Sequence, residues 1–324
     1  MIEDTPARVE SEVEASEAPE VLEAPAVTTP EGGDVLNPEG LLKLMWRTFS
    51  QNKLALVSVG VLLFMVLFCF VGPYVYRTQQ VNSYLVVNNP VNYPWFHSLQ
   101  FPLGTDPSGF NILGRLMYGG KSALIVGLLA GVISTFFGAI YGAIAGYRGG
   151  WLDAVLMRGV DTGLSIPQIF LLIAIITAFG ASVTSIVLTL SFTGWFGSSR
   201  LIRGETLSLR TREYVMAVRA MGGTNRRIIL RHILPNAVGT MVVIGTFAVA
   251  DSILALTTLG FLGLGLHPPQ TDWGTMLNNG VSYLANSYWW EIVPAGMCIV
   301  IVILTLNYIG DALRDAFETR LLQR

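Results

Sequence analysis

The sequence predicts an all-α membrane protein with six transmembrane helices, and three observations lead to this fold class. The chain has 324 residues, of which 52% are hydrophobic and only 13% are charged, whereas a soluble domain is typically about 25% charged. The charged residues are separated by uncharged runs about as long as the 20 residues that cross a bilayer. The basic residues gather in alternate connections between these runs. This composition excludes a soluble nucleic-acid binder, a disordered protein and a secreted disulfide scaffold.

The net charge of −2 conceals an uneven distribution along the chain. Residues 1–40 hold 11 of the 22 acids and a single base, Arg8, so this segment carries −10 and the remainder +8. The segment has no basic start followed by an apolar stretch, so we do not expect a signal peptide. Because it also lacks aromatic residues, we expect a disordered acidic cytoplasmic tail, and nothing in its composition assigns it a specific role.

Five uncharged or nearly uncharged runs define the predicted spans. The third run is long enough for two spans, with a turn at Gly180–Ser182, and the fourth is interrupted only by Asp251. We therefore divide the chain into the tail, an N-terminal span with an external loop (41–112) and a membrane core (113–324). The runs are Leu54–Tyr76, Ser122–Tyr147, Thr162–Ser199, His232–Thr271 and Ile292–Gly310.

The orientation follows from the positive-inside rule. Eight arginines lie between spans 4 and 5, at positions 200, 203, 210, 212, 219, 226, 227 and 231, while the 3–4 turn and the 5–6 loop have no base. The loop between spans 1 and 2 has three bases, two of them near the start of span 2. We therefore expect both termini in the cytoplasm and Trp289-Trp290 at the outer end of span 6.

The sequence offers no candidate catalytic residue, metal site or cofactor site. The three histidines are far apart, and HExxH, GxSxG and CxxC patterns are absent. The stretch Gly114–Ser122 resembles a phosphate-binding loop, but five residues instead of four separate its two key glycines. We expect it to be an interfacial segment in which Lys121 anchors span 2. Cys69 and Cys298 lie within spans and are expected to be packing residues.

Two features of the spans suggest close contacts. Span 2 has glycines at helical spacing, at 127, 131, 138, 142 and 146, which allow helices to approach each other within one subunit or between subunits. Asp251 places a carboxylate inside span 5, which costs about 2.5–3.5 kcal/mol on insertion scales. This residue is expected to line a pathway, to face another subunit, or to be a hydrogen-bonded structural acid.

The connection between spans 4 and 5 is predicted to form two short helices. Thr211 is a candidate cap for the first, and Tyr214, Val218 and Met221 share one face of it. Gly222-Gly223 ends that helix, Thr224 or Asn225 begins the second, and Pro235 marks its end. A loop that only fixes topology is the alternative, and the spans on both sides argue against a DNA-binding helix-turn-helix.

The residues of this connection resemble the cytoplasmic EAA loop of binding-protein-dependent ABC importer permeases, and the whole chain resembles the second permease of the dipeptide/oligopeptide/nickel family. The loop pattern is Glu213…Ala217…Gly222…Leu234-Pro235. Further markers between residues 43 and 320 are Trp46-Arg47, Asn52-Lys53, Pro102–Asp106, Arg115, Arg231–Asn236, Phe261–Gly265, Pro268-Pro269, Trp273-Gly274 and Gly310-Asp311.

This resemblance implies an ATP-driven importer of di- or oligopeptides in the bacterial cell membrane. Expected partners are a homologous permease, two cytoplasmic ATP-binding subunits, an extracytoplasmic solute-binding protein and membrane lipid, but no nucleic acid. ATP hydrolysis is expected in the partner subunits and not in this chain. The residues implied in coupling to the ATPase are Glu213, Ala217, Gly222, Gly223, Arg226, Arg227, Leu234 and Pro235.

Import of nickel or another small solute, and a non-transporting scaffold, are the alternatives. The chain departs from the usual family pattern at Phe110-Asn111, where Arg-Asp is common, and near Leu256, where an acid is common. Gly260 and Asp272 each stand where the family usually has Ser.

Overall fold

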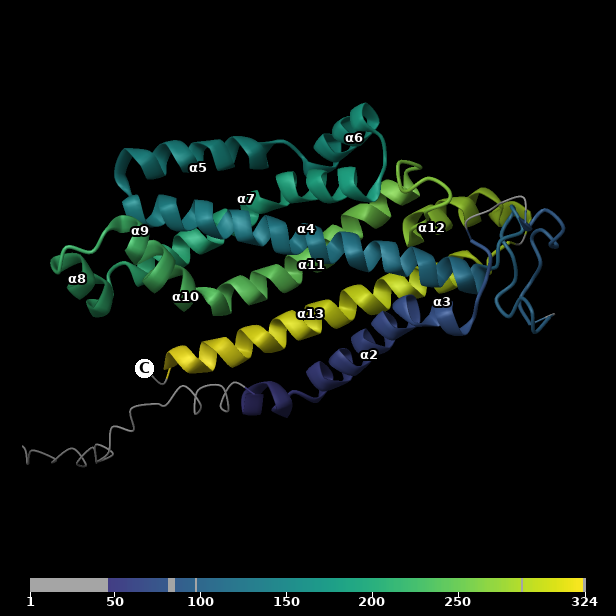
Figure 1. Ribbon diagram of the computed structural model, residues 1–324, viewed down its shortest axis with the longest axis horizontal. Helices are drawn as coiled ribbons and strands as arrows, with labels where there is room; N and C mark the ends of the chain where they lie inside the picture. Colours follow the sequence, from purple (N-terminus) through teal and green to yellow (C-terminus); the bar gives the residue numbers. More distant parts are fainter. Residues whose placement is uncertain (1–45, 81–84, 97, 287, 323–324) are drawn as a thin grey trace, which may run out of the picture.

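A computed structural model describes residues 46–80, 85–96, 98–286 and 288–322. The predicted acidic tail, residues 1–40, lies outside the described residues. Within them the chain is helical apart from loops and one isolated bridge between Thr105 and Asn111. The long helices lie side by side in an elongated bundle, with short helices and loops gathered at its two ends (Figure 1).

The helices follow one another with few long connections. In chain order they are α2 (Lys53–Phe70), α3 (Gly72–Val75), α4 (Ile112–Arg148), α5 (Gly150–Ser165), α6 (Gln168–Phe179), α7 (Val183–Leu209), α8 (Glu213–Ala220), α9 (Asn225–Ile228), the π-helical turn η2 (Ile229–Ile233), α10 (Leu234–Asn236), α11 (Val238–Phe261), α12 (Trp273–Ser282), the 3₁₀ turn η3 (Leu284–Asn286) and α13 (Ile292–Leu322).

The all-helical membrane fold is confirmed, with four or five candidate spans among the described residues. Helices α2, α4, α11 and α13 are long and apolar enough to cross a membrane. Helices α5 and α6 together supply a fifth candidate, bent by 80° where Ile166 precedes Pro167 and takes an extended conformation. Helix α7, which contains the predicted fourth span, is rich in Ser, Thr and Gly and is not among these candidates. The predicted turn at Gly180–Ser182 joins α6 to α7.

The glycines of α4 allow close packing within the chain. Gly127 and Gly131 lie against α11, and Gly138, Gly142 and Gly146 lie against α7. A Cβ atom on Gly142 would lie 2.2 Å from the carbonyl oxygen of Ser199. The spacing seen in the sequence therefore brings helix backbones together inside one subunit.

The stretch that resembles a phosphate-binding loop is part of the continuous helix α4. The N–H of Gly114 donates to the side chain of the capping residue Asn111 at 3.3 Å, and the N–H groups that follow bond along the helix. The stretch therefore forms no cradle for phosphate. Gly120 serves packing instead, because a Cβ there would lie 2.5 Å from the indole of Trp273. That indole is fully buried and donates to the carbonyl of Leu116 at 3.0 Å.

Two apolar clusters form the core. The larger lies among α2, α4, α7, α11, α12 and α13 and includes Cys69 and Cys298, which are buried free thiols. The packing role predicted for them is confirmed. The smaller cluster lies beneath α8–α10 and includes Val215, Ile228 and Ile233.

The bundle has two distinct ends (Figure 1). We call the end that carries α8–α10 the basic end, and the C-terminal part of α13 lies there too. The cap end carries residues 76–80, 85–96 and 98–111 and helix α12. Trp289 and Trp290 lie at the cap end, where the Trp95 indole donates to the carbonyl of Trp290 at 3.0 Å. This contact ties the loop before α4 to the start of α13.

A buried ionic cluster joins the same segments at the cap end. Arg115 of α4 donates to Asp106 at 3.1 Å, and its guanidinium lies 4.2 Å from the centre of the Phe110 ring. Tyr288 and Glu291, just before α13, are each only 1% exposed. Burial, together with the charge of Asp106, raises the pKa of Glu291 to about 8.

The hydrogen bonds indicate where the proton of this cluster resides. The Tyr288 hydroxyl lies 3.1 Å from the carbonyl oxygen of Thr105 and 2.9 Å from a carboxyl oxygen of Glu291. A hydroxyl has one proton to donate, so it satisfies both oxygens only if Glu291 is protonated and donates to it. The raised pKa of Glu291 and this geometry both favour its protonated form, beside the ion pair of Asp106 and Arg115.

Gly260 and Asp272, two of the residues that depart from the usual family pattern, lie next to each other in the structure. Asp272 is fully buried and caps α12: its carboxylate accepts from the amides of Leu266 and Thr275 at 3.0 and 2.9 Å. A Cβ atom on Gly260 would lie 2.2 Å from Oδ1 of Asp272. The carboxylate thus occupies the space that a side chain at position 260 would need.

This contact predicts a compensating pair. We expect Gly260→Ser alone to destabilise the protein by about 1–3 kcal/mol through overpacking, and Asp272→Ser alone to leave the amide of Leu266 without its acceptor. The double variant should lose less stability than the sum of the losses in the two single variants. A double-mutant cycle on thermal unfolding measures this coupling, and additive losses would contradict it.

Candidate coupling surface

The connection between α7 and α11 is a folded unit at the basic end. Helix α7 ends at Leu209, and the next residue, Arg210, donates from Nη1 to the carbonyl of Gly146 at the end of α4, at 2.8 Å. This bond supplies a partner for a C-terminal carbonyl of α4. The start of the connection is thereby held against the bundle.

Helix α8 begins at Glu213, and its cap position lies one residue after the predicted cap, Thr211. Arg212 occupies the cap position without a side-chain bond, while the Thr211 hydroxyl donates back to Ser208. Of the three residues predicted to share one face of this helix, Met221 lies beyond the last residue of α8 and is 78% exposed. Val215 is buried and Val218 packs against the same cluster, so these two valines anchor α8 to the bundle.

The end of α8 has the hydrogen bonds of a Schellman motif. Gly222 is left-handed, with φ of +80°, and its N–H donates to Arg219 at 3.1 Å. The N–H of Gly223 donates to Val218 at 3.0 Å. A Cβ on Gly223 would lie 2.7 Å from the Val218 side chain, whereas nothing lies within 4 Å of one on Gly222. Gly222 therefore leaves an open position on the outer surface of the loop.

The second helical segment is continuous from α9 to α10. Thr224, one of the two residues predicted to begin this helix, is its cap and accepts from the amide of Arg227 at 3.4 Å. Pro235 does not end it but lies within α10, after the π turn η2. Proline lacks an N–H, which favours such a widened turn. The Asn236 side chain donates to the carbonyl of His232 at 2.6 Å. This bond adds a donor to the turn in which Pro235 has none.

The structure brings the predicted coupling residues together on this one loop. All are exposed except two, Gly223 and Leu234, which are half-buried. Exposed arginines and apolar side chains surround them, and this mixture of charge and apolar area is typical of a protein interface. These surrounding residues are Arg212, Arg219, Arg231, Met216, Met221 and Leu230.

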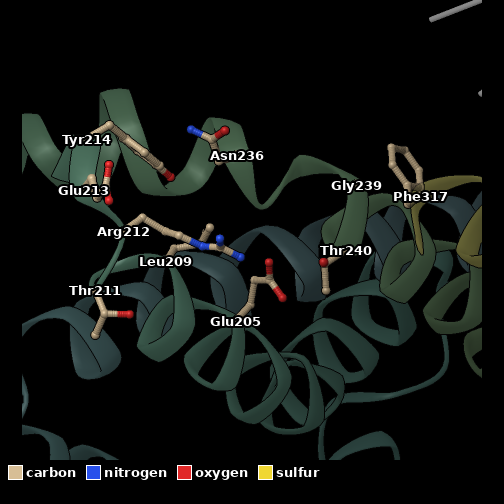
Figure 2. Close-up of a pocket in the computed structure, with 10 residues that line it drawn as sticks. All are labelled: Glu205, Leu209, Thr211, Arg212, Glu213, Tyr214, Asn236, Gly239, Thr240 and Phe317. Atoms are coloured by element: carbon tan, nitrogen blue, oxygen red, sulfur yellow. The ribbon is translucent and has the colours of Figure 1, made fainter. Parts of the chain in front are cut away.

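A cleft of about 840 Å³ lies between this loop and the bundle (Figure 2). Arg212 points into it towards Glu205 of α7, and Thr240 of α11 lies on the far side. Sequence reasoning did not identify Glu205, Thr240 or Phe317 as members of one site. They come from three helices far apart in the chain, and no local pattern connects them.

Asp251 lies near the middle of α11 and points away from the core. It is exposed, whereas its neighbours Ala250, Ser252 and Ile253 are buried. Leu254, one turn further, is 48% exposed on the same side. The interpretation as an internally hydrogen-bonded acid therefore loses support, since no acceptor or donor for Asp251 occurs among the described residues.

Comparison with known proteins agrees with this architecture. Residues 138–323 match the family model described as binding-protein-dependent transport system inner membrane component. Residues 40–90 match the N-terminal TM domain of oligopeptide transport permease C.

Curated relatives match most of the chain. The dipeptide transport system permease protein DppC of Bacillus subtilis is 34% identical over 278 residues, covering 85% of each chain. The oligopeptide transport system permease protein OppC of Haemophilus influenzae is 36% identical, covering 85% of this chain and 87% of its own. OppC of Mycobacterium tuberculosis is 37% identical, covering 85% and 93%.

A solved structure shares the fold. A chain of the MetNI methionine ABC transporter in inward facing conformations superposes with a TM-score of 0.52 at 19% identity, covering 62% of this chain and 96% of that one. With the matched families and relatives, this establishes the chain as a multi-pass inner membrane protein and a transport subunit. The chain belongs to the inner membrane components of binding-protein-dependent transport systems and is a permease of the OppC/DppC type.

Proposed function

We propose that this chain is the second permease of an ATP-driven, binding-protein-dependent importer of di- and oligopeptides. The relatives named above are dipeptide and oligopeptide permeases, which supports the substrate class. The proposed assembly contains a homologous permease, two cytoplasmic ATP-binding subunits and an extracytoplasmic solute-binding protein. In this assembly the chain provides half of the pathway, and hydrolysis takes place in the partner subunits.

The proposed topology has six spans, with the basic end and both termini in the cytoplasm. Helix α7 is the proposed span whose hydropathy alone does not identify it as a membrane helix. It has 27 residues, enough for about 40 Å, and it packs along the glycines of α4. Its Ser and Thr hydroxyls donate to carbonyls of the same helix, as Ser191 does to Val187 at 2.7 Å, which lowers their cost in lipid.

The observation that carries the coupling proposal is the fixed, outward-facing Gly222 turn. Two valines anchor α8, Arg210 anchors its start, and the Schellman bonds fix its end. The ATPase would contact the exposed face of this rigid unit through Glu213, Ala217 and Gly222, with Arg226 and Arg227 beside them. Arginine pairs at an exposed rim contribute little affinity each, so the shape of the turn matters most.

The transport proposal is tested by reconstituting the chain with its partner subunits in proteoliposomes that contain ATP. We expect uptake of labelled di- or tripeptides that depends on the binding protein and on hydrolysis. Uptake of Ni²⁺ without peptide uptake would contradict the substrate class. Assembly with the ATPase without any transport would indicate a scaffold instead.

For Asp251 we propose a role in the pathway or at the permease interface. Replacing it by Asn removes the charge and keeps the size, so we expect peptide uptake to fall by about tenfold, the loss from a perturbation of about 1.4 kcal/mol. Asp251→Glu, which keeps the charge, should retain more uptake. Co-purification of all subunits is the control for assembly, and unchanged uptake by Asp251→Asn with unchanged assembly would contradict the proposal.

A further inference from the structure

Two basic residues at the cap end lack an acidic partner. Of the three bases between α2 and the first charge-free run of α4, Arg115 is buried and paired with Asp106. Arg77 and Lys121 have no carboxylate within 4.0 Å among the described residues. Arg77 is exposed and Lys121 is half-buried. The cap end is the external end in the expected topology, where Lys and Arg are disfavoured. Two unpaired bases there suggest that they bind something.

These two bases line one pocket. It has a volume of about 440 Å³ and lies where α2 and α3 meet α4. The Lys121 ammonium lies 5.9 Å from the centre of the Phe70 ring, within cation–π distance. The lining residues are Phe70, Pro73, Tyr74, Arg77, Thr78, Tyr118 and Lys121. The pocket therefore combines two cations with aromatic rings and hydroxyl groups.

The pocket lies at the boundary of the apolar spans. Arg77 is the first charge after the uncharged run of the first span, and Lys121 is the last charge before that of the second. Helix α4 has 37 residues, about 55 Å, and a hydrocarbon core of about 30 Å leaves its first turns outside. Both bases therefore lie at the depth of lipid phosphate groups, where Tyr side chains are also favoured.

An apolar track leads from the pocket into the membrane. Leu128 and Val132 lie on the same side of α4 as Lys121, at helical spacings of seven and eleven residues. They are 57% and 55% exposed. An acyl chain attached to a phosphate at Lys121 would cover them.

We propose that Arg77 and Lys121 bind the phosphate of a membrane phospholipid with an anionic headgroup, of the phosphatidylglycerol type. The guanidinium offers a planar pair of donors to phosphate oxygens, and the ammonium adds a point charge. A zwitterionic headgroup would bring its own ammonium beside these two cations. The site therefore selects phosphatidylglycerol over phosphatidylethanolamine.

Native mass spectrometry of the assembled transporter, titrated with each of these two lipids, tests the proposal. We expect the wild type to retain phosphatidylglycerol preferentially. Each base near the surface contributes about 1 kcal/mol, so Arg77→Gln with Lys121→Gln should weaken retention roughly 30-fold. The exchange R77K with K121R, which keeps both charges, should retain the lipid. Lys53→Gln, at the other end of α2, is the matched control and should leave retention unchanged.

Three results would overturn the proposal. One is equal retention of phosphatidylglycerol by the doubly neutralised variant, provided that its thermal unfolding matches the wild type. Another is equal retention of the zwitterionic lipid by the wild type. The third is displacement of the lipid by excess inorganic phosphate, which would show that the pocket recognises the isolated anion. None of these results bears on whether the assembled transporter imports peptides.

Discussion

Gly222→Trp is expected to weaken coupling strongly while the permease still folds and inserts. Nothing lies within 4 Å of a Cβ atom at Gly222 in this chain, so a side chain there starts from open space and projects towards a docking partner. Overpacking a contact costs about 1–3 kcal/mol, which lowers the affinity for the ATPase roughly 5- to 150-fold. Co-purification of the ATPase and peptide-stimulated hydrolysis measure the effect.

The matched control for this variant is Gly180→Trp. Gly180 has φ of +81° and equally open surroundings, but it lies in the turn between α6 and α7. With ψ of 155°, Gly180 lies in a region that is even less accessible to other residues than that of a Schellman glycine, so Gly180→Trp imposes at least as much backbone strain as Gly222→Trp. If Gly180→Trp weakened coupling to the same extent, or if Gly222→Trp assembled and transported normally, the docking assignment would be wrong. Gly222→Ala, which adds strain without bulk, should retain most of the coupling.

Glu291→Gln is expected to remove a loss of stability that the wild type undergoes as the pH rises. The pKa of Glu291 is raised by burial and by Asp106 from 4.5 to about 8, so the folded state binds more protons than the unfolded state between these pH values. Its contribution to stability is fully present below about pH 4.5, falls as the pH rises, and is lost above about pH 8. One pKa unit corresponds to about 1.4 kcal/mol, so the loss amounts to a few kcal/mol.

The measurement is the melting temperature of wild type and variant between pH 5 and pH 9. The difference between the two curves should change in favour of Glu291→Gln as the pH rises, because the amide remains neutral and can still donate to Tyr288. Glu205→Gln, the same exchange at the basic end, controls for the loss of a carboxyl group as such. A difference curve that is flat across this range would contradict the assignment of the proton to Glu291.

The sequence allowed the helical class, the turn at Gly180–Ser182 and the two-helix form of the coupling loop to be predicted, because these depend on local signals. Uncharged runs predict membrane helices, and glycine pairs predict helix ends, independently of the tertiary contacts around them. The number of spans was harder to predict. Helix α7 is rich in Ser, Thr and Gly, and its composition does not show that its hydroxyls are satisfied by its own backbone. The chain also bends by 80° between α5 and α6, at Pro167.

The sites that depend on tertiary contacts were not predictable. Glu291 gave no signal in the sequence, since its protonation arises from Asp106, Thr105 and Tyr288, of which two lie more than 180 positions away. The contact between Gly260 and Asp272 was not predictable either, because in the sequence they are two separate departures from the usual family pattern. Met221 was predicted to share one face with Tyr214 and Val218 from its spacing, but α8 ends at Ala220 and Met221 is exposed.

Helix α4 has a mechanical consequence for the whole molecule. Its first turns carry Arg115, which is tied to Asp106 of the cap end, and its last carbonyls include that of Gly146, which accepts from Arg210 at the start of the coupling loop. One unbroken rod thus touches both ends. A tilt of about 10° would move one end of a rod of about 55 Å by about 10 Å relative to the other. A displacement imposed at the loop therefore reaches the opposite side of the membrane by leverage, without a relay of side-chain rearrangements.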